Sequence, residues 1–174
     1  MNEHDLTHLA SRVPEVATMK ALTIHQPWAS LIMAGVKKYE TRPMRMNYRG
    51  PLAIHAALKP FEQVFDSWGH VTEAVRKEET IMRLLQTDNL RDLPKGVVLG
   101  TVEVVDCGRI TLPFEPPAPP YIWNDDLDCY RRTIIGEDER ALGNWHDGSY
   151  AIKLANPVLF PEPIPARGQQ GLWN

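Results

Sequence analysis

The chain has 174 residues, of which 43% are hydrophobic, and a formal net charge of −3 at pH 7. This length fits one domain, and no apolar run approaches the roughly 20 residues that a membrane span needs, so nothing here is expected to cross a bilayer. The acidic balance argues against a protein that coats long duplexes through phosphate contacts, although it leaves room for a small basic pocket.

The first 18 residues are expected to form an N-terminal extension to a single domain that covers residues 19–174. They carry Glu3, Asp5 and Glu15 where a secretory signal would place a basic start and an apolar stretch. A cytoplasmic location is therefore expected.

Cys107 and Cys129 are the only cysteines of the chain. Neither lies in a CxxC pair or near a histidine at metal-ligand spacing, so no metal site is expected on them. Free buried cysteine is common in intracellular proteins, which favours two reduced structural thiols. The sequence also lacks a phosphate-binding glycine-rich loop and a nucleophile elbow. We expect no metal ion and no cofactor.

Short strands and one short helix are expected in the first third of the domain. The helix begins at Pro27, whose fixed φ suits a first helical turn, and ends at Gly35. A turn at residues 48–51 leads into the third strand. The predicted strands are Lys20–Ile24, Lys37–Arg42 and Leu52–Ala57.

The rest of the domain is expected to combine a helical insert, a central strand and a long loop. Apolar residues recur at steps of three and four between about residues 60 and 90, which predicts helix. Val97–Val105 is β-branched and predicts the central strand. Residues 113–144 begin with a run of prolines and predict an irregular, proline-rich loop with one short helix. The remaining predictions are a strand at Ser149–Leu154, its continuation at Val158–Phe160 and a packed Trp173. This order of elements argues for an α+β domain with a strongly bent sheet or a small barrel.

A cluster of charged side chains follows the predicted helix. Lys37, Glu40 and Arg42 form, with Gly35, the pattern G-x-K-x-x-E-x-R. Alternate residues of a strand share a face, so Glu40 and Arg42 are expected side by side, and Lys37 joins them only if it precedes the strand or lies at a bulge. One interpretation is an exposed strand edge with alternating charges. The other is a ligand site, in which Arg42 offers a planar fork, Glu40 accepts from an amine and Lys37 neutralises a phosphate or acts as a base.

Further candidate binding residues surround this cluster. His25 and Gln26 stand where the first strand meets the helix N-terminus, which is a natural anion site, although His25 could equally satisfy local backbone groups. Trp28 is either a core residue or a stacking platform. Arg49 lies in the turn before the third strand. On that strand His55 faces away from the side of its apolar neighbours, so it is either exposed or lines a cavity.

Several blocks of sequence carry a family resemblance. LTIHQPWASLI, GVKKYETR and YRGPLAIHA occur in this order, and PIPARGQQGLW follows near the end. Together they resemble the ASCH domain family over roughly Lys20–Trp173, with the helical insert and the proline-rich loop fitting least well. The resemblance implies a PUA-like fold, which is a small twisted β-barrel with flanking helices, and a cleft into which the charged segment projects. Members of the family are described as nucleic-acid binders, ribonucleases and amidohydrolases that act on N4-acetylcytidine.

The resemblance also bears on catalysis. The amidohydrolase members are said to use a lysine, a threonine and a glutamate. Lys37 matches the lysine, but Glu40 occupies the position of the threonine, and Thr41 would face the other side of a strand. A water attack with Glu40 as general base remains open, because a partly desolvated carboxylate can have a raised pKa. Lys37 and Glu40 are therefore the candidate catalytic residues.

The leading hypothesis is a binding module whose cleft accepts a nucleotide, or an extruded base of single-stranded nucleic acid, with RNA or a modified nucleoside as ligand. The alternative is a metal-independent hydrolase that acts on a modified nucleoside or on RNA in the same cleft. A third interpretation is a protein-interaction domain with residues 113–120 as its contact surface.

Overall fold

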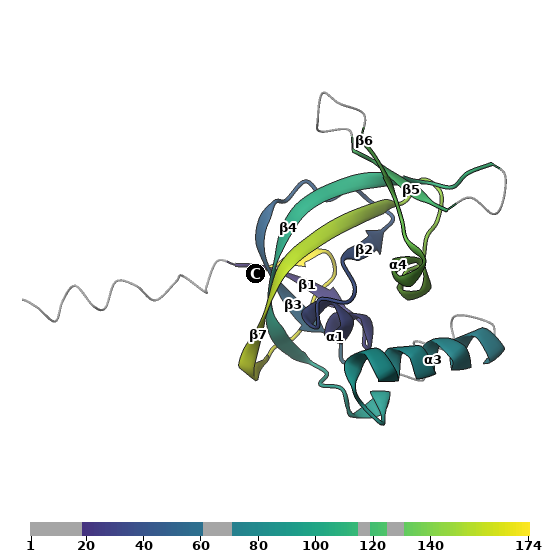
Figure 1. Ribbon diagram of the computed structural model, residues 1–174. Coiled ribbons are helices and arrows are strands. Elements are labelled where there is room, and N and C mark those ends of the chain that lie inside the picture. The colour runs from purple at the N-terminus through teal and green to yellow at the C-terminus, as the bar shows by residue number, and fades with distance from the viewer. Residues whose placement is uncertain (1–18, 61–70, 115–118, 125–130) are drawn as a thin grey trace, which may run out of the picture.

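The computed structural model describes residues 19–60, 71–114, 119–124 and 131–174 (Figure 1). The predicted N-terminal extension therefore lies outside the described residues. The helical elements are α1 (Trp28–Met33), α3 (Val71–Leu85), α4 (Glu137–Leu142) and the 3-10 turn η4 (Leu90–Asp92). The strands are β1 (Lys20–Ile24), β2 (Tyr39–Arg42), β3 (Gly50–Ala56), β4 (Val97–Thr111), β5 (Tyr121–Asn124), β6 (Arg131–Ile134), β7 (Tyr150–Pro165) and β8 (Leu172–Trp173).

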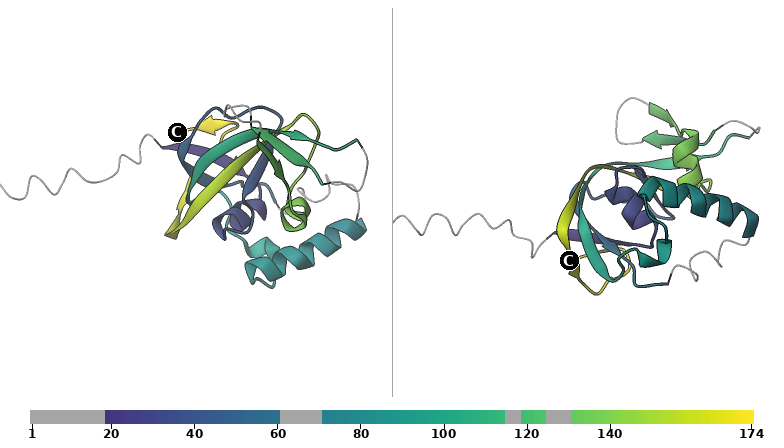
Figure 2. Two further views of the ribbon diagram at one scale, coloured as in Figure 1. Left: turned by 45° about the horizontal axis from the view of Figure 1, so that its top comes forward. Right: turned by 60° about the horizontal axis from the view of Figure 1, so that its bottom comes forward.

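The strands of the described residues form one mixed sheet, which curls into a half-barrel (Figures 1 and 2). The strand order is β2-β7-β4-β3-β1-β8, and β5 and β6 extend the sheet from one end of β4. β1 and β3 pair in parallel, which requires a crossover connection, and the segment containing α1 provides it. The predicted α+β fold, a small twisted barrel with flanking helices, is confirmed.

The main core lies between α1 and the sheet. Leu52 and Ile54 of β3 are both 0% exposed, and they point to the same side because alternate residues of a strand share a face. They belong to one buried cluster with Ile32 of α1, Val102 of β4 and Ile152 of β7. α1 is short because Gly35 takes a φ of +72°, a conformation that ends a helix. The core therefore fixes α1 against the strands that surround the site described below.

The segment 113–144 is more regular than the sequence predicts. The expected short helix is present as α4, but the prediction of an irregular loop is wrong for β5 and β6, which pair with each other as a hairpin. Ile122 of β5 is buried with Ile110 of β4 and Ile135, so burial of one face holds the hairpin on the sheet. The prolines precede this hairpin, and its first strand carries aromatic and β-branched residues that favour strand structure.

β4 and β7 are both longer than predicted. β4 continues to Thr111, and β7 runs from Tyr150 through the proline-containing stretch to Pro165. β2 pairs only with residues 150–153 of β7. Prolines are tolerated in the rest of β7 because that edge has no strand partner among the described residues and thus needs no N–H donors.

The end of the chain is anchored on β1, as predicted for Trp173. β8 pairs antiparallel with β1, and the Trp173 indole N–H donates to Thr23 Oγ1 at 3.1 Å. The indole also contacts the His55 ring edge to face, with centroids 5.6 Å apart. Residues 166–173 therefore cover the side of β1 and β3 that faces away from the main core. Among the described residues, no helix combines the length and the apolar character that crossing a bilayer requires.

Candidate functional site

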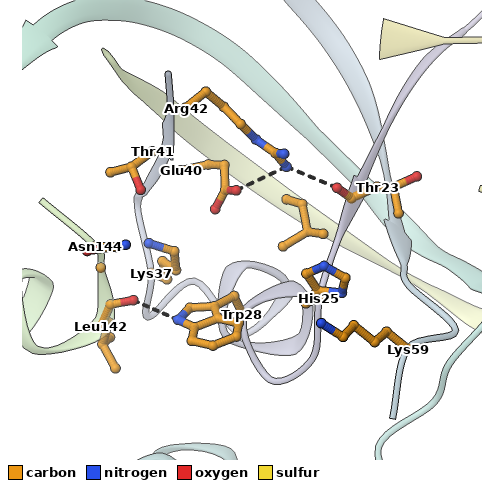
Figure 3. A pocket seen from close by; sticks show the side chains of 12 residues that line it. Thr23, His25, Trp28, Lys37, Glu40, Thr41, Arg42, Lys59, Leu142 and Asn144 are labelled. Atoms are coloured by element: carbon orange, nitrogen blue, oxygen red, sulfur yellow. Dashed lines mark hydrogen bonds and ion pairs between the residues drawn. The ribbon is translucent and has the colours of Figure 1, made fainter. Parts of the chain in front are cut away.

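A cavity of about 250 Å³ lies where the end of β1, the start of α1, β2 and the end of α4 come together (Figure 3). Five of the residues singled out in the sequence line it: His25, Trp28, Lys37, Glu40 and Arg42. The remaining lining residues include Thr23, Thr41, Lys59, Leu142 and Asn144. The cavity is thus the place where the charged motif and the strand–helix junction meet.

Lys37 lies just before β2, which is the position that allows it to share the cavity with Glu40. It is 3% exposed, and its Nζ lies 3.9 Å from Glu139 Oε1. Burial lowers the pKa of Lys37, while the carboxylates of Glu40 and Glu139 act in the opposite direction. A buried amine with a lowered pKa can bind as a donor or take part in proton transfer.

Glu139 of α4 holds the start of β2 in place. One of its carboxylate oxygens accepts the backbone N–H of Lys38, and the other accepts that of Tyr39, each at 3.0 Å. The same carboxylate faces Lys37. A single acidic side chain therefore satisfies two backbone donors and compensates a buried ammonium group.

Glu40 and Arg42 form an ion pair in the lining of the cavity. Arg42 Nη2 lies 3.1 Å from Glu40 Oε1 and also donates to the Thr23 carbonyl oxygen at 2.9 Å. Arg42 Nε is buried and has no hydrogen-bond partner among the residues that the structure describes. The guanidinium is thus held across the gap between β2 and β1, with one donor still unused.

Trp28 forms part of the cavity wall and fastens α4 to α1. Its indole N–H donates to the Leu142 carbonyl oxygen at 2.9 Å (Figure 3). The indole is partly buried against the core clusters on either side of α1. Trp28 thus packs against the core, and it also lines the cavity.

His25 and Lys59 approach the cavity from the carboxyl ends of β1 and β3. The pKa of His25 is lowered, first by its partial burial and then by the positive charges of Lys59 and Arg42. The parallel register pairs Ile24 with Ala56, so the residues that follow both strands emerge at the same edge of the sheet. This explains why a residue 34 positions after His25 lies beside it.

Three residues that were predicted to bind a ligand lie outside the cavity, namely Gln26, Arg49 and His55. Gln26 is 2% exposed; its side chain donates to the Pro94 carbonyl oxygen at 2.8 Å and accepts the Ser30 N–H. Arg49 lies near Asp106, with 3.7 Å between Nη2 and Oδ1, and its guanidinium also donates to backbone carbonyl oxygens of its own turn. Both side chains serve local structure.

His55 faces away from the main core, as its place in the strand predicts, yet it is neither exposed nor in the cavity. It is 2% exposed. Its Nε2 lies 3.1 Å from the Ala166 carbonyl oxygen, and Trp173 packs against the ring. The alternation of β3 could not reveal this, because the covering segment comes from the far end of the sequence.

The sequence reasoning missed Thr23, Lys59, Glu139 and Asn144. For Lys59 the link is the parallel pairing of the first and third strands, which places it next to His25 and which the sequence pattern does not show. Glu139 and Asn144 belong to a segment about 100 residues beyond β2 in the sequence, and no local pattern links them to the motif. Among the described residues, no group of three or more His, Cys, Asp or Glu side chains could hold a metal ion.

Comparison with known proteins identifies the family to which the chain belongs. The ASCH domain family model matches residues 22–117, which include every charged residue of the motif. Activating signal cointegrator 1 of Mus musculus is 36% identical over 156 residues, covering 87% of this chain and 21% of its own length. Activating signal cointegrator 1 of Homo sapiens is 37% identical over 90 residues, covering 49% of this chain and 14% of its own length. The chain thus spans about a fifth or less of the length of these relatives. Because the family model matches more than half of its residues, the chain belongs to the ASCH domain family.

Proposed function

We propose that the cavity binds one nucleobase or nucleoside, presented either as a free nucleotide or as an extruded base of single-stranded nucleic acid. Membership of the ASCH domain family supports a nucleic-acid-binding role at the level of the family. The observation that carries the proposal is the convergence of Lys37, Glu40 and Arg42 on a cavity that also contains the edge of Trp28.

The chemistry of these side chains suits a base edge. Glu40 can accept from an exocyclic amino group, while the Lys37 amine and the Arg42 guanidinium can donate to ring nitrogens or carbonyl oxygens. Trp28 offers an aromatic surface next to them. Flat heterocycles with donors and acceptors on one edge match this combination better than a purely anionic or a purely apolar ligand does.

The size of the cavity limits the ligand. Pockets for drug-sized molecules have volumes of about 300–1,000 Å³, and this cavity measures about 250 Å³. One base or nucleoside is therefore the expected occupant, and the rest of a nucleic acid would have to pass over the surface.

Titration with fluorescently labelled single-stranded RNA and DNA hexamers tests this proposal. Replacing Arg42 by Gln, or Lys37 by Met, should weaken binding about tenfold or more, because a hydrogen bond to a charged group contributes about 1.5–3 kcal/mol. Arg49→Gln is the matched control, since it removes the same charge from a residue outside the cavity. Unchanged affinity in the Lys37→Met/Arg42→Gln double variant would exclude this cavity as the binding site.

A hydrolase is the second candidate function, and the environment of Lys37 favours it. A buried amine with a lowered pKa between two carboxylates resembles a proton-transfer site more than a simple binding site. Purified protein incubated with N4-acetylcytidine and with RNA would test it. Turnover by the wild type that Lys37→Met abolishes, while the variant still binds the substrate, would support catalysis. Binding without any turnover would instead support the binding module.

A further inference from the structure

Two basic side chains at one end of the cavity take no part in the recognition of a base. His25 follows β1, and Lys59 follows β3 at the same edge of the sheet. Figure 3 shows both side chains on the same side of the cavity, with Arg42 above them and Trp28 alongside. Three groups that carry or can gain a positive charge therefore border one corner.

Among the residues that the structure describes, no acidic side chain is paired with His25 or Lys59 at this corner. Neither His25 nor Lys59 has a side-chain hydrogen bond or ion pair within the part of the chain that the structure describes. Glu40, the one carboxylate that lines the cavity among the described residues, is paired with Arg42 at 3.1 Å, and Lys37 faces Glu139. Partial burial lowers the pKa of His25 most, and the positive charges of Lys59 and Arg42 lower it further. Since no described carboxylate is paired with His25 or Lys59, their positive charge is suited to binding an anion.

We propose that His25 and Lys59, next to Arg42, form a phosphate subsite that holds the phosphate attached to the base in the cavity. This inference rests on the proposed function, and it names the ligand class as a nucleotide rather than a nucleoside. Lysine ammonium and imidazolium groups donate strong, charge-assisted hydrogen bonds to phosphate oxygens. The phosphate could be the monoester of a free nucleotide or the diester of a strand.

Proton uptake should accompany binding at this subsite. In the free protein the neighbouring cations favour neutral His25, whereas a bound phosphate favours its imidazolium form. The pKa of His25 should therefore be higher in the bound protein than in the free protein. Affinity for the phosphate should increase as the pH falls from the higher to the lower of these two pKa values. A phosphodiester is the better probe for this effect, because a phosphomonoester titrates in the same pH range.

Isothermal titration calorimetry with inorganic phosphate, cytidine, cytidine 5′-monophosphate and a dinucleoside monophosphate tests the proposal. The phosphate-bearing nucleosides should bind about tenfold more tightly than cytidine. Lys59→Gln should remove this difference, and His25→Asn should remove the pH dependence with the dinucleoside monophosphate. Lys95→Gln is the charge-matched control, since the Lys95 ammonium donates to the Arg91 carbonyl oxygen and does not line the cavity.

The outcomes separate the two proposals. Equal affinity for cytidine and its phosphorylated forms overturns the subsite and leaves the base pocket standing. Phosphate binding that depends on Lys59, without any binding of cytidine, supports the subsite and contradicts the base pocket. Absence of binding by all four probes overturns both. Preference for the monoester identifies a free nucleotide as the ligand, and preference for the diester identifies a strand; either result supports the subsite.

Discussion

At the scale of single residues, the site is organised around a buried lysine. Lys37 is almost completely removed from solvent, and the negative charges of Glu40 and Glu139 offset part of the cost of burying its ammonium group. Desolvation nevertheless outweighs these carboxylates, so the folded protein binds the Lys37 proton less tightly than the unfolded chain does.

Because of this lysine, the free energy of unfolding should change with pH in the alkaline range. Its folded pKa lies below its unfolded value, so the unfolded state binds more protons between the two, and stability should rise with pH across that interval. The free energy of unfolding can be measured with urea at pH 7 and at pH 9.5. Between these two pH values it should increase more for the wild type than for the Lys37→Met variant. Identical changes in the two proteins would mean that Lys37 ionises normally in the fold.

Replacing Glu139 by Ala should cost about 1–3 kcal/mol of unfolding free energy. It leaves the N–H groups of Lys38 and Tyr39 without their acceptor and removes a charge from beside Lys37. Chemical denaturation measures the loss. Glu137→Ala, in the same short helix but exposed, is the control and should change stability by less than about 0.5 kcal/mol.

The sequence predicted part of this residue-level arrangement. Period-2 geometry placed Glu40 and Arg42 on one face, and they form an ion pair. The requirement that Lys37 precede its strand is met. Gln26 could not be assigned to structure from the sequence, because the Pro94 carbonyl that accepts from its side chain lies 68 residues away.

At the scale of elements, the cavity is built by segments that come from both ends of the domain. α4 closes one side through Glu139 and the Leu142 carbonyl. The segment 166–173 supports the opposite side through Thr23, whose hydroxyl accepts from Trp173 while its carbonyl accepts from Arg42. Local patterns identified α1, β1 and β3, since these depend on nearby residues, but they missed β5 and β6 and the full length of β4 and β7. They could not show which later segments cover them.

Gly168 is the point where the C-terminal segment fits most tightly. A Cβ there would lie 2.4 Å from His55 Cε1 and 2.7 Å from Thr23 Oγ1. Gly168→Ala should therefore displace the segment and destabilise the fold by about 1–3 kcal/mol. Thermal unfolding measures this change. Gly136→Ala is the control, because a Cβ at that position meets nothing within 4 Å; equal melting temperatures for the two variants would contradict the packing described.

At the scale of the whole molecule, the half-barrel depends on long-range pairing. β1 joins β3 and β8, and β4 joins β3 and β7, so these pairs form across large sequence separations, unlike the local hairpin of β5 and β6. The order of the predicted elements argued for an α+β domain with a bent sheet or a small barrel, and the family resemblance favoured the barrel. Strand order and the parallel β1–β3 pair were not predictable from short-range periodicity, because period-2 alternation is the same in parallel and antiparallel strands.

Long-range pairing should also appear in the folding kinetics. Closing large loops is slow, so the contact between β8 and β1 should form after the main transition state. Trp173→Phe removes one hydrogen bond to Thr23 and should accelerate unfolding while leaving the folding rate nearly unchanged. Stopped-flow chevron measurements check this. A slower folding rate for Trp173→Phe would mean that β8 already contacts β1 in the transition state.

The contact between Trp173 and Thr23 has a consequence for synthesis in the cell. These residues are 150 positions apart in the sequence, and a ribosome makes the chain from its amino end. The motif that lines the cavity therefore leaves the ribosome long before the segment that steadies Thr23 exists. A nascent chain would carry an unfinished cavity, and a ligand would find a complete one only after residues 172 and 173 had emerged and paired with the first strand.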